Sequence, residues 1–353
     1  MALPASGQIT LNQVNVELGN SGTAQIGMND ADVRGLFGIA SGEIEMSDGY
    51  GKSNVAWYGE RGIIAGGESK NFISYITIST TGNASDFGDL LKDLSAMGAC
   101  SDGSRVVFAG GMSFLTSTYA YNGIQYITAA TTGNATSFGT LSYGQYFGVA
   151  GFSDGTRGVF AGGRPRPGYT NFTDSIGYIT IASTGNSTDF GNLLSASSND
   201  FWSDMGACSN GTRGVFGGAG VYASSNVMQY LTIASTGNAT DFGDLTVSRG
   251  SIAGFSGGDR GVFAGGYADV SPYSGFNTID YISIPTTGNA TDFGDLSTTS
   301  FSMAGLSDNS RGVTASGKNV NTMSYITIAT TGNSTDFGDL NYSAYYVTGS
   351  SGT

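Results

Sequence analysis

The sequence lacks the side chain that most often moves protons in enzymes. Its 353 residues include no histidine, which excludes histidine general bases, histidine-containing metal sites and Ser-His-Asp triads. Asp and Glu number 27 against 14 for Lys and Arg, which gives a formal net charge of −13. Because nucleic-acid phosphates are bound by clustered Lys and Arg, we expect no nucleic-acid partner. For a polysaccharide ligand, the acidic balance favours a neutral sugar, or a contact bridged by a cation, over a phosphate-rich chain.

Two motifs are similar to known functional motifs but depart from them at a required position. Gly51-Lys52-Ser53 ends like a phosphate-binding P-loop, yet Met46 stands where that loop needs its first glycine. Ser153-Asp154-Gly155-Thr156 is similar to the Asp-box of sialidase propellers, but its aspartate follows the serine directly. A sialidase-like site also needs clustered arginines around a tyrosine nucleophile. We therefore expect no catalytic residue and no enzymatic activity.

The arginines follow a pattern that indicates a structural role. Six of the ten arginines occupy one position of an internal repeat. An aspartate stands three residues earlier in several copies, as in Asp102 and Arg105 or Asp154 and Arg157. We expect these arginines to pair with the neighbouring aspartates.

A further set of side chains has the chemistry of a calcium site. Asn83, Asp86 and Asp89 recur along the chain, and hard oxygen ligands are those that Ca²⁺ takes. The same side chains also accept hydrogen bonds from turn amides. The second copy replaces both acids, with Ser137 and Thr140, and keeps the rest of the motif. That loss favours the turn role, so we expect no bound metal and no cofactor.

The two cysteines lie in matching surroundings. Cys100 and Cys208 are each preceded by Met-Gly-Ala and followed by Ser, so they occupy one position in two copies of a repeat. Two copies apart, their Cα atoms should lie farther apart than the roughly 7 Å limit for a disulfide. We expect two buried, reduced thiols.

These motifs belong to a repeat that covers most of the chain. A segment that reads Arg-Gly-Val-Phe-Ala-Gly-Gly in its complete form recurs every 44 to 56 residues. Its copies begin at Arg61, Arg105, Arg157, Arg213, Arg260 and Arg311. Each is followed by a second segment, which runs from Tyr-Ile-Thr-Ile through Thr-Gly-Asn to Asp-Phe-Gly-Asp-Leu in its most complete form. The pair is present in six copies.

Each copy divides into four short strands. In the third copy these are residues 159–161, 178–181, 189–193 and 205–209, separated by stretches rich in Gly, Asn and Asp. No copy contains a helical period. A four-stranded antiparallel unit repeated about every 50 residues is typical of a β-propeller with one blade per repeat, and the Gly-Gly pair resembles kelch repeats. We predict an all-β fold, a six-bladed kelch-like β-propeller over residues 54–353, with a β-solenoid as the alternative.

Residues 1–53 lie outside the repeat and are predicted to form a small, mostly helical or irregular module. Apolar residues at helical spacing predict two short helices, the second capped by Asn29. The residues expected to carry its docking contacts are Leu11, Val14, Leu18, Val33, Leu36 and Phe37. A segment this small buries little core alone, so we expect it to pack on a partner, on copies of itself or on the propeller. We find neither a membrane-spanning stretch nor a secretory signal, so we expect synthesis in a cytosol and no membrane insertion.

Two stretches resemble virion proteins of tailed bacteriophages, especially cyanophages. The first reads Ile-Thr-Leu-Asn-Gln-Val-Asn-Val-Glu-Leu-Gly over residues 9–19, continues over residues 41–53, and is similar to an N-terminal module of phage tail and fibre proteins. The second is the repeat array itself. The resemblance implies a virion structural protein of the tail or neck, made in the host cytoplasm, in a fibre or host-recognition role. Residues 1–53 would then contact other virion proteins, and several copies would present their sites together as a homo-oligomer.

The copies differ mainly in one set of loops. In a four-stranded meander, the connections between strands one and two and between strands three and four leave one rim. The remaining turns leave the other rim, and they are nearly invariant here. Variable loops on a rigid scaffold are the usual place for binding, and aromatic side chains dominate binding hot spots. The loop residues expected to contact a ligand or receptor are Phe114, Tyr119, Tyr121, Tyr143, Tyr146, Phe147, Tyr169, Phe172, Phe201, Trp202, Tyr222, Tyr267, Tyr273 and Phe276.

The sequence thus favours an adhesin that binds a host surface glycan or protein through these loops. Two alternatives stay open. In the first, the chain is a structural connector or decoration subunit of tail, neck or capsid, and the aromatic loops pack on other virion chains. In the second, it is an enzyme that degrades surface polysaccharide, with two carboxylates or an arginine cluster converging in a pocket on the loop rim.

Overall fold

The computed structural model describes residues 60–113, 115, 120–142, 147–164, 173–194, 202–220, 224–268, 275–318 and 320–351, together with Val14 and Val33. The chain divides into two compact units, Met1–Trp57 and Tyr58–Thr353. In the first unit, Val14 and Val33 are helical and buried. The other predicted docking residues, Leu11, Leu18, Leu36 and Phe37, lie outside the described residues, so the module stays a prediction. No helix in the described part of the chain is long and apolar enough to cross a membrane.

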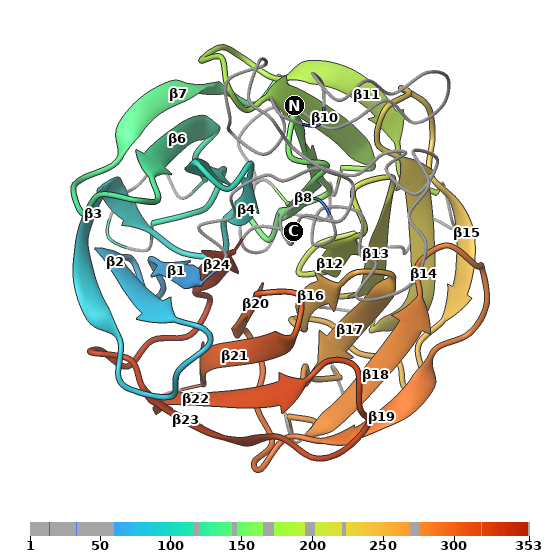
Figure 1. The fold of residues 1–353 in the computed structure, drawn as a ribbon. Helices are drawn as coiled ribbons and strands as arrows, with labels where there is room; N and C mark the ends of the chain where they lie inside the picture. The colour runs from blue at the N-terminus through green and yellow to red at the C-terminus, as the bar shows by residue number, and fades with distance from the viewer. Residues whose placement is uncertain are drawn as a thin grey trace. The chain divides into compact units, whose positions relative to one another are not determined.

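The second unit is a six-bladed β-propeller, as the repeat predicts. Six four-stranded antiparallel sheets surround one axis, and the chain runs around the ring from blue to red (Figure 1). The red strand at the end of the chain lies beside the blue strand that begins the first blade, so the ring is closed. A closed ring excludes the predicted alternative, an open solenoid.

We number the blades along the chain and give their strands from the axis outward. Blade one holds β24 (Thr348–Ser350), β1 (Arg61–Ala65), β2 (Lys70–Thr77) and β3 (Ser85–Leu94). Blade two holds β4 (Gly98–Ser101), β5 (Arg105–Ala109), β6 (Gly123–Thr128) and β7 (Thr136–Thr140). Blade three holds β8 (Ala150–Ser153), β9 (Arg157–Ala161), β10 (Ser175–Thr180) and β11 (Thr188–Asn192).

The other three blades follow the same order. Blade four holds β12 (Gly206–Ser209), β13 (Arg213–Ala219), β14 (Ser225–Thr232) and β15 (Thr240–Asp244). Blade five holds β16 (Ala253–Gly257), β17 (Arg260–Ala264), β18 (Thr278–Ser283) and β19 (Thr291–Asp295). Blade six holds β20 (Ala304–Ser307), β21 (Arg311–Gly317), β22 (Val320–Thr327) and β23 (Thr335–Asp339).

Each blade takes its innermost strand from the preceding repeat. The repeat pattern places strand β12 with the third copy, but β12 pairs with β13 of the next copy across the tight turn at Asn210-Gly211. The last repeat therefore has a strand left over, and this strand, β24, pairs with β1, with Ile63 opposite Ser350. The offset by one strand closes the ring through main-chain hydrogen bonds between the two ends of the propeller.

The inner strands are apolar throughout because both faces of each sheet pack against a neighbouring blade. In β5, β9 and β17, every residue after the arginine is buried. The buried clusters span adjacent blades: Cys100 and Val107 of blade two pack in one cluster with Phe160 and Ile179 of blade three. Burial on both faces explains why these strands show a continuous apolar run instead of strand-like alternation.

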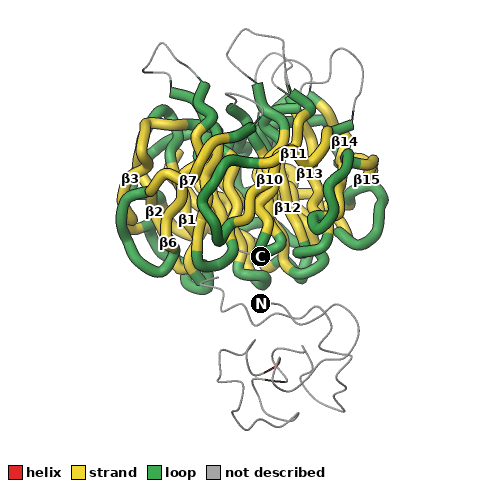
Figure 2. Tube along the Cα trace, turned by 90° about the horizontal axis from the view of Figure 1, so that it is seen from above, coloured by secondary structure: helices red, strands yellow, loops and turns green. Residues whose placement is uncertain are grey.

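The two rims of the propeller carry different connections, as the meander predicts (Figure 2). One rim, which we call the hairpin face, holds the turn between the third and fourth strands of every blade and the turn between the first and second strands of blades two to six. The other rim, the loop face, holds the loop between the second and third strands and the linker from each outer strand to the next blade. The diversified sequences therefore gather on one side of the propeller.

Candidate functional site

The repeated arginines join neighbouring blades. The guanidinium of Arg157 lies 4.3 Å from the ring centre of Tyr178 and donates to the carbonyl of Ile233 in the next blade at 2.8 Å. Tyr178 in turn packs edge-to-face on Phe190. The same arginine–tyrosine stack and carbonyl contact recur in all six blades. These side chains hold the ring together and form no arginine cluster for an anion.

The aspartates before these arginines have a different partner from the predicted one. Asp154 Oδ1 accepts hydrogen bonds from the main-chain N–H groups of Thr156 and Arg157, at 2.8 and 2.6 Å. Asp102 does the same with Ser104 and Arg105. A carboxylate two or three residues before a turn amide is well placed to cap that turn. The aspartate thus shapes the hairpin, and the guanidinium is free to reach the next blade.

The asparagines of the calcium-like motif form a latch between outer strands. Asn134 Oδ1 accepts from the main-chain N–H of Asp89 in the preceding blade at 3.0 Å, and Gly133 N–H donates to the carbonyl of Phe87 at 2.8 Å. The equivalent asparagines Asn83, Asn186, Asn238, Asn289 and Asn333 make the same contact around the ring. Within the described ranges, no three Asp, Glu or Cys side chains converge as a metal site would need.

Both cysteines are buried and unbridged. Cys100 and Cys208 are free thiols, 2 % and 3 % exposed. Burial raises the pKa of each thiol far above its ordinary value, and Asp102 and Asp154 add to this effect at Cys100. Thiolate is the reactive form, so these side chains serve as packing groups, as predicted.

The aromatic residues predicted to contact a ligand fall into three groups. Nine lie outside the described residues: Phe114, Tyr119, Tyr143, Tyr146, Tyr169, Phe172, Phe201, Tyr222 and Tyr273. Two, Tyr121 and Phe276, are half-buried on the loop face. Three, Phe147, Trp202 and Tyr267, are buried, at 0 %, 4 % and 6 % exposure.

The buried three support the bases of the loops. Phe147 lies under the guanidinium of Arg164, 4.4 Å from its ring centre, and pairs with it as a β-bridge. The indole N–H of Trp202 donates to the carbonyl of Leu194 at 2.9 Å. Protein atoms cover the ring faces of these three side chains, so the candidate stacking residues are the other members of the predicted set.

The loop-face mouth of the propeller axis is a site that the sequence analysis missed. A cavity of about 100 Å³ opens there. Each blade contributes the residue two positions before its innermost strand begins: Ala96, Gly148, Asp204, Ser251, Ser302 and Tyr346. Unlike the conserved core of the repeat, this position changes from copy to copy, and that variation is the signal that could have found it.

A closed ring of main-chain hydrogen bonds shapes this mouth. The N–H of each of the six residues donates to the carbonyl of its counterpart in the preceding blade, at 2.7 to 3.0 Å. All six have left-handed backbone conformations, with φ between 53° and 71°. These amides and carbonyls are hydrogen-bonded to one another, so the side chains at the six positions are the groups that can select a ligand.

One buried acid marks the mouth. Asp204 Oδ2 lies 4.0 Å from Arg164 Nη2 and accepts from the Ser203 hydroxyl at 3.1 Å. Burial raises the pKa of the Asp204 carboxyl above its ordinary value, and Arg164 and Ser203 oppose that rise. Among the described residues that line this cavity, Asp204 is the sole carboxylic acid. These residues therefore include no carboxylate pair of the kind that glycoside hydrolysis uses.

The opposite end of the axis, on the hairpin face, is uniform. The hydroxyl of Ser153 donates to the carbonyl of Ser101, and Ser209, Ser256 and Ser307 each repeat the contact with the serine before them, at 2.5 to 2.7 Å. These serines bond to one another around a smaller cavity of about 60 Å³. The axis therefore shows the same asymmetry as the rims.

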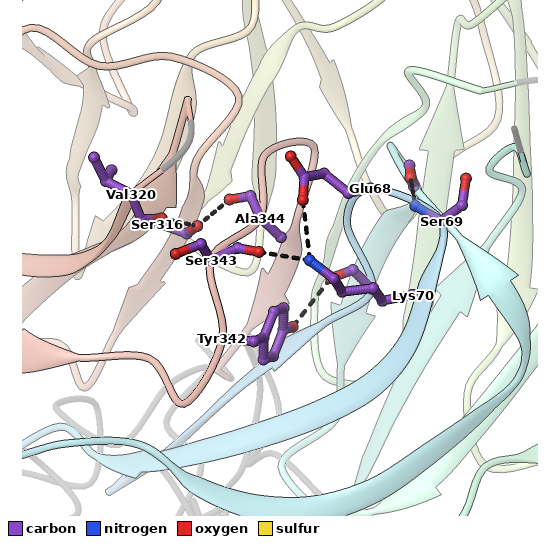
Figure 3. Close-up of polar contacts among 10 residues, drawn as sticks. Glu68, Ser69, Lys70, Ser316, Val320, Tyr342, Ser343 and Ala344 are labelled. Atoms are coloured by element: carbon purple, nitrogen blue, oxygen red, sulfur yellow. Dashed lines mark hydrogen bonds and ion pairs between the residues drawn. The ribbon is translucent and has the colours of Figure 1, made fainter.

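The seam between blades six and one carries its own polar contacts (Figure 3). Lys70 Nζ lies 3.0 Å from Glu68 Oε2 and donates to the carbonyl of Ser343 at 2.6 Å. The Tyr342 hydroxyl donates to the carbonyl of Gly66 at 3.0 Å, and Ser316 donates to Ala344. The Lys70–Ser343 and Tyr342–Gly66 contacts tie the linker before β24 to the first blade, and the Ser316–Ala344 contact ties it to blade six.

Searches of protein-family models and of curated proteins found no match to this sequence.

Proposed function

We propose that this protein is a virion adhesin of a tailed phage, a non-enzymatic fibre or neck subunit that binds a host surface glycan or protein through its loop face. The supporting observation is the unequal treatment of the two rims. On the hairpin face the outer-strand latch recurs in all six blades and the same Asp or Asn cap recurs in four inner turns, whereas the loop face changes in length and side chain from blade to blade.

The uniform contacts of the hairpin face serve the closure of the ring. Closure does not require the loop face to differ from blade to blade. Structural need alone would keep repeated loops similar. Diversity on a rigid scaffold is what recognition of an irregular surface requires. The resemblance of residues 9–19 and 41–53 to phage tail modules supplies the biological setting, with residues 1–53 docking on other virion proteins and the virion as the location.

The test is competition with phage adsorption. Excess purified protein should slow adsorption of the phage to its host bacterium, because it occupies the receptor. A loop-face variant, Tyr146→Ser, Tyr169→Ser and Tyr222→Ser, should lose most of this effect, since interface aromatics each contribute on the order of 1–2 kcal/mol or more.

A matched hairpin-face variant serves as control. Thr80→Ala, Thr132→Ala and Thr287→Ala change three exposed turn residues and should compete like the parent protein. If the parent protein does not compete, the adhesin proposal fails and the connector or decoration role replaces it. If both variants compete equally well, the loop aromatics are not the contact.

A further inference from the structure

We propose that the loop-face mouth of the axis is a binding pocket for the hydroxylated edge of a neutral sugar, held by Asp204, Ser251 and Ser302. This inference rests on the proposed function, because it assigns a ligand class and residues to the loop face. It begins from the two serines, which come from adjacent blades and line the same cavity.

Both serine hydroxyls are buried without a hydrogen-bond partner. Ser251 and Ser302 are 5 % and 6 % exposed, and neither Oγ reaches a donor or acceptor of the protein. A buried hydroxyl left unpaired costs free energy. At the other end of the axis, Ser153, Ser209, Ser256 and Ser307 avoid this cost, because each hydroxyl donates to the carbonyl of the equivalent serine in the preceding blade. The loop-face serines therefore have hydrogen-bonding capacity available for a ligand.

The charges at the mouth disfavour ionic ligands. An anion would face the Asp204 carboxylate in a protein of net charge −13. A cation would find one carboxylate that already lies 4.0 Å from a guanidinium. A neutral ligand with several hydroxyls avoids both penalties, since it can donate to Asp204 and exchange hydrogen bonds with two serines.

The polar groups occupy one side of the mouth only. Asp204, Ser251, Ser302 and Tyr346 come from four successive blades, while the remaining two positions are Ala96 and Gly148. An added Cβ at Gly148 would lie 3.0 Å from each Asp204 carboxylate oxygen, so glycine leaves space beside that carboxylate. The arrangement of hydrogen-bonding groups along one edge of an open cavity suits the edge of a sugar ring with adjacent hydroxyls.

The test uses the full-length protein with Ser251→Ala and Ser302→Ala together. Ala96 holds the equivalent position with φ of 53°, the value found at Ser251, so alanine suits this backbone and the variant should fold. The control, Ser79→Ala and Ser183→Ala, alters two exposed serines of hairpin-face turns. The probes are the methyl glycosides of glucose, galactose, mannose and N-acetylglucosamine, measured by ligand-detected NMR and calorimetry.

At least one of these glycosides should bind the parent and control proteins in a saturable way. The pocket variant should bind it about tenfold or more weakly, because two hydrogen bonds are lost, and its melting temperature should be no lower than that of the parent, because the two unpaired hydroxyls are removed. Equal affinity in all three proteins would overturn the inference, as would the absence of saturable binding by any glycoside, which would mean that the serines bond only to water.

The adsorption assay separates this inference from the proposed function. If the parent protein competes with phage but binds no glycoside, the pocket assignment fails and the adhesin survives with another contact surface. If the parent protein neither competes nor binds a glycoside, both proposals fail. If the pocket variant loses both glycoside binding and competition, the pocket is the receptor contact.

Discussion

At the scale of single residues, one buried ion pair distinguishes blade five. In blades two and four, Gln125 and Gln229 accept the main-chain N–H groups of Leu91 and Leu194 from the preceding blade's outer segment, at 2.8 and 2.7 Å. The equivalent residue in blade five is Asp280, which accepts from Thr246 and lies 3.0 Å from Arg249 Nη2, with both side chains fully buried. Burial lowers the pKa of Arg249, and Asp280 opposes that effect. The arginine therefore depends on the carboxylate for compensation of its charge.

Removing that carboxylate should be strongly destabilising. Asp280→Asn leaves the Arg249 charge buried without its counter-ion, and we expect a loss of about 3–5 kcal/mol in the free energy of unfolding, measured by urea denaturation. Glu68→Gln breaks a partly exposed pair and should cost less than about 1 kcal/mol. Adding Arg249→Met to Asp280→Asn should recover much of the loss. Equal losses for Asp280→Asn and Glu68→Gln would contradict this account of the pair.

At the scale of strands and turns, glycine positions mark where neighbouring blades approach. An added Cβ at Gly158 would collide with the Sγ of Cys100, and one at Gly214 with the ring of Phe152. Blade two alone has a valine at this glycine position, Val106. The inner strand of the preceding blade, blade one, carries the smaller Ser350 at the position equivalent to Cys100. The size of one blade's inner side chain thus decides whether the next blade needs glycine.

The latch between outer strands also requires glycine at a close approach. Gly191 has φ of 147°, and a Cβ there would collide with the carbonyl oxygen of Gly237 in the next blade. Gly191→Ala should therefore lower the free energy of unfolding by more than about 1 kcal/mol, seen as a lower melting temperature. Gly185→Ala is the matched control, because its Cβ would meet open space. If the two variants melt together, the close approach at the latch does not limit stability.

At the scale of the whole propeller, closure depends on the last strand of the chain. Strand β24 covers the inner edge of β1, and the seam contacts of Lys70 and Tyr342 support it. Without β24 the first blade would present an unpaired edge, which favours aggregation. The two ends of the propeller stabilise each other, although they are far apart in the sequence.

Truncation tests this dependence. A chain that ends at Ala344 should melt on the order of 10 °C lower than the parent and form soluble aggregates, measured by calorimetry and size-exclusion chromatography. A chain that ends at Ser351 retains β24 and should behave like the parent protein. A truncated chain that stays monomeric with an unchanged melting temperature would show that main-chain pairing at the seam contributes little.

Much of this fold follows from the sequence because a strict repeat restricts the possible structures. Six copies of one strand pattern with invariant turns predict six blades and two unequal rims, and the arginine period indicates a structural role. The partner of each arginine was not predictable, because a carbonyl in the next blade leaves no mark on residue type. The nearby Asp102 and Asp154 looked like partners for the arginines, yet they bond to turn amides.

The tertiary structure decided which variable residues meet. Asp204, Ser251 and Ser302 are 47 and 51 residues apart along the chain, and only closure of the ring brings them to one cavity. Phe147, Trp202 and Tyr267 share their aromatic character with the loop tips, but neighbours from distant segments bury them. Composition and spacing report local preferences, whereas burial and convergence at the axis depend on contacts between blades, which form only when all six are in place.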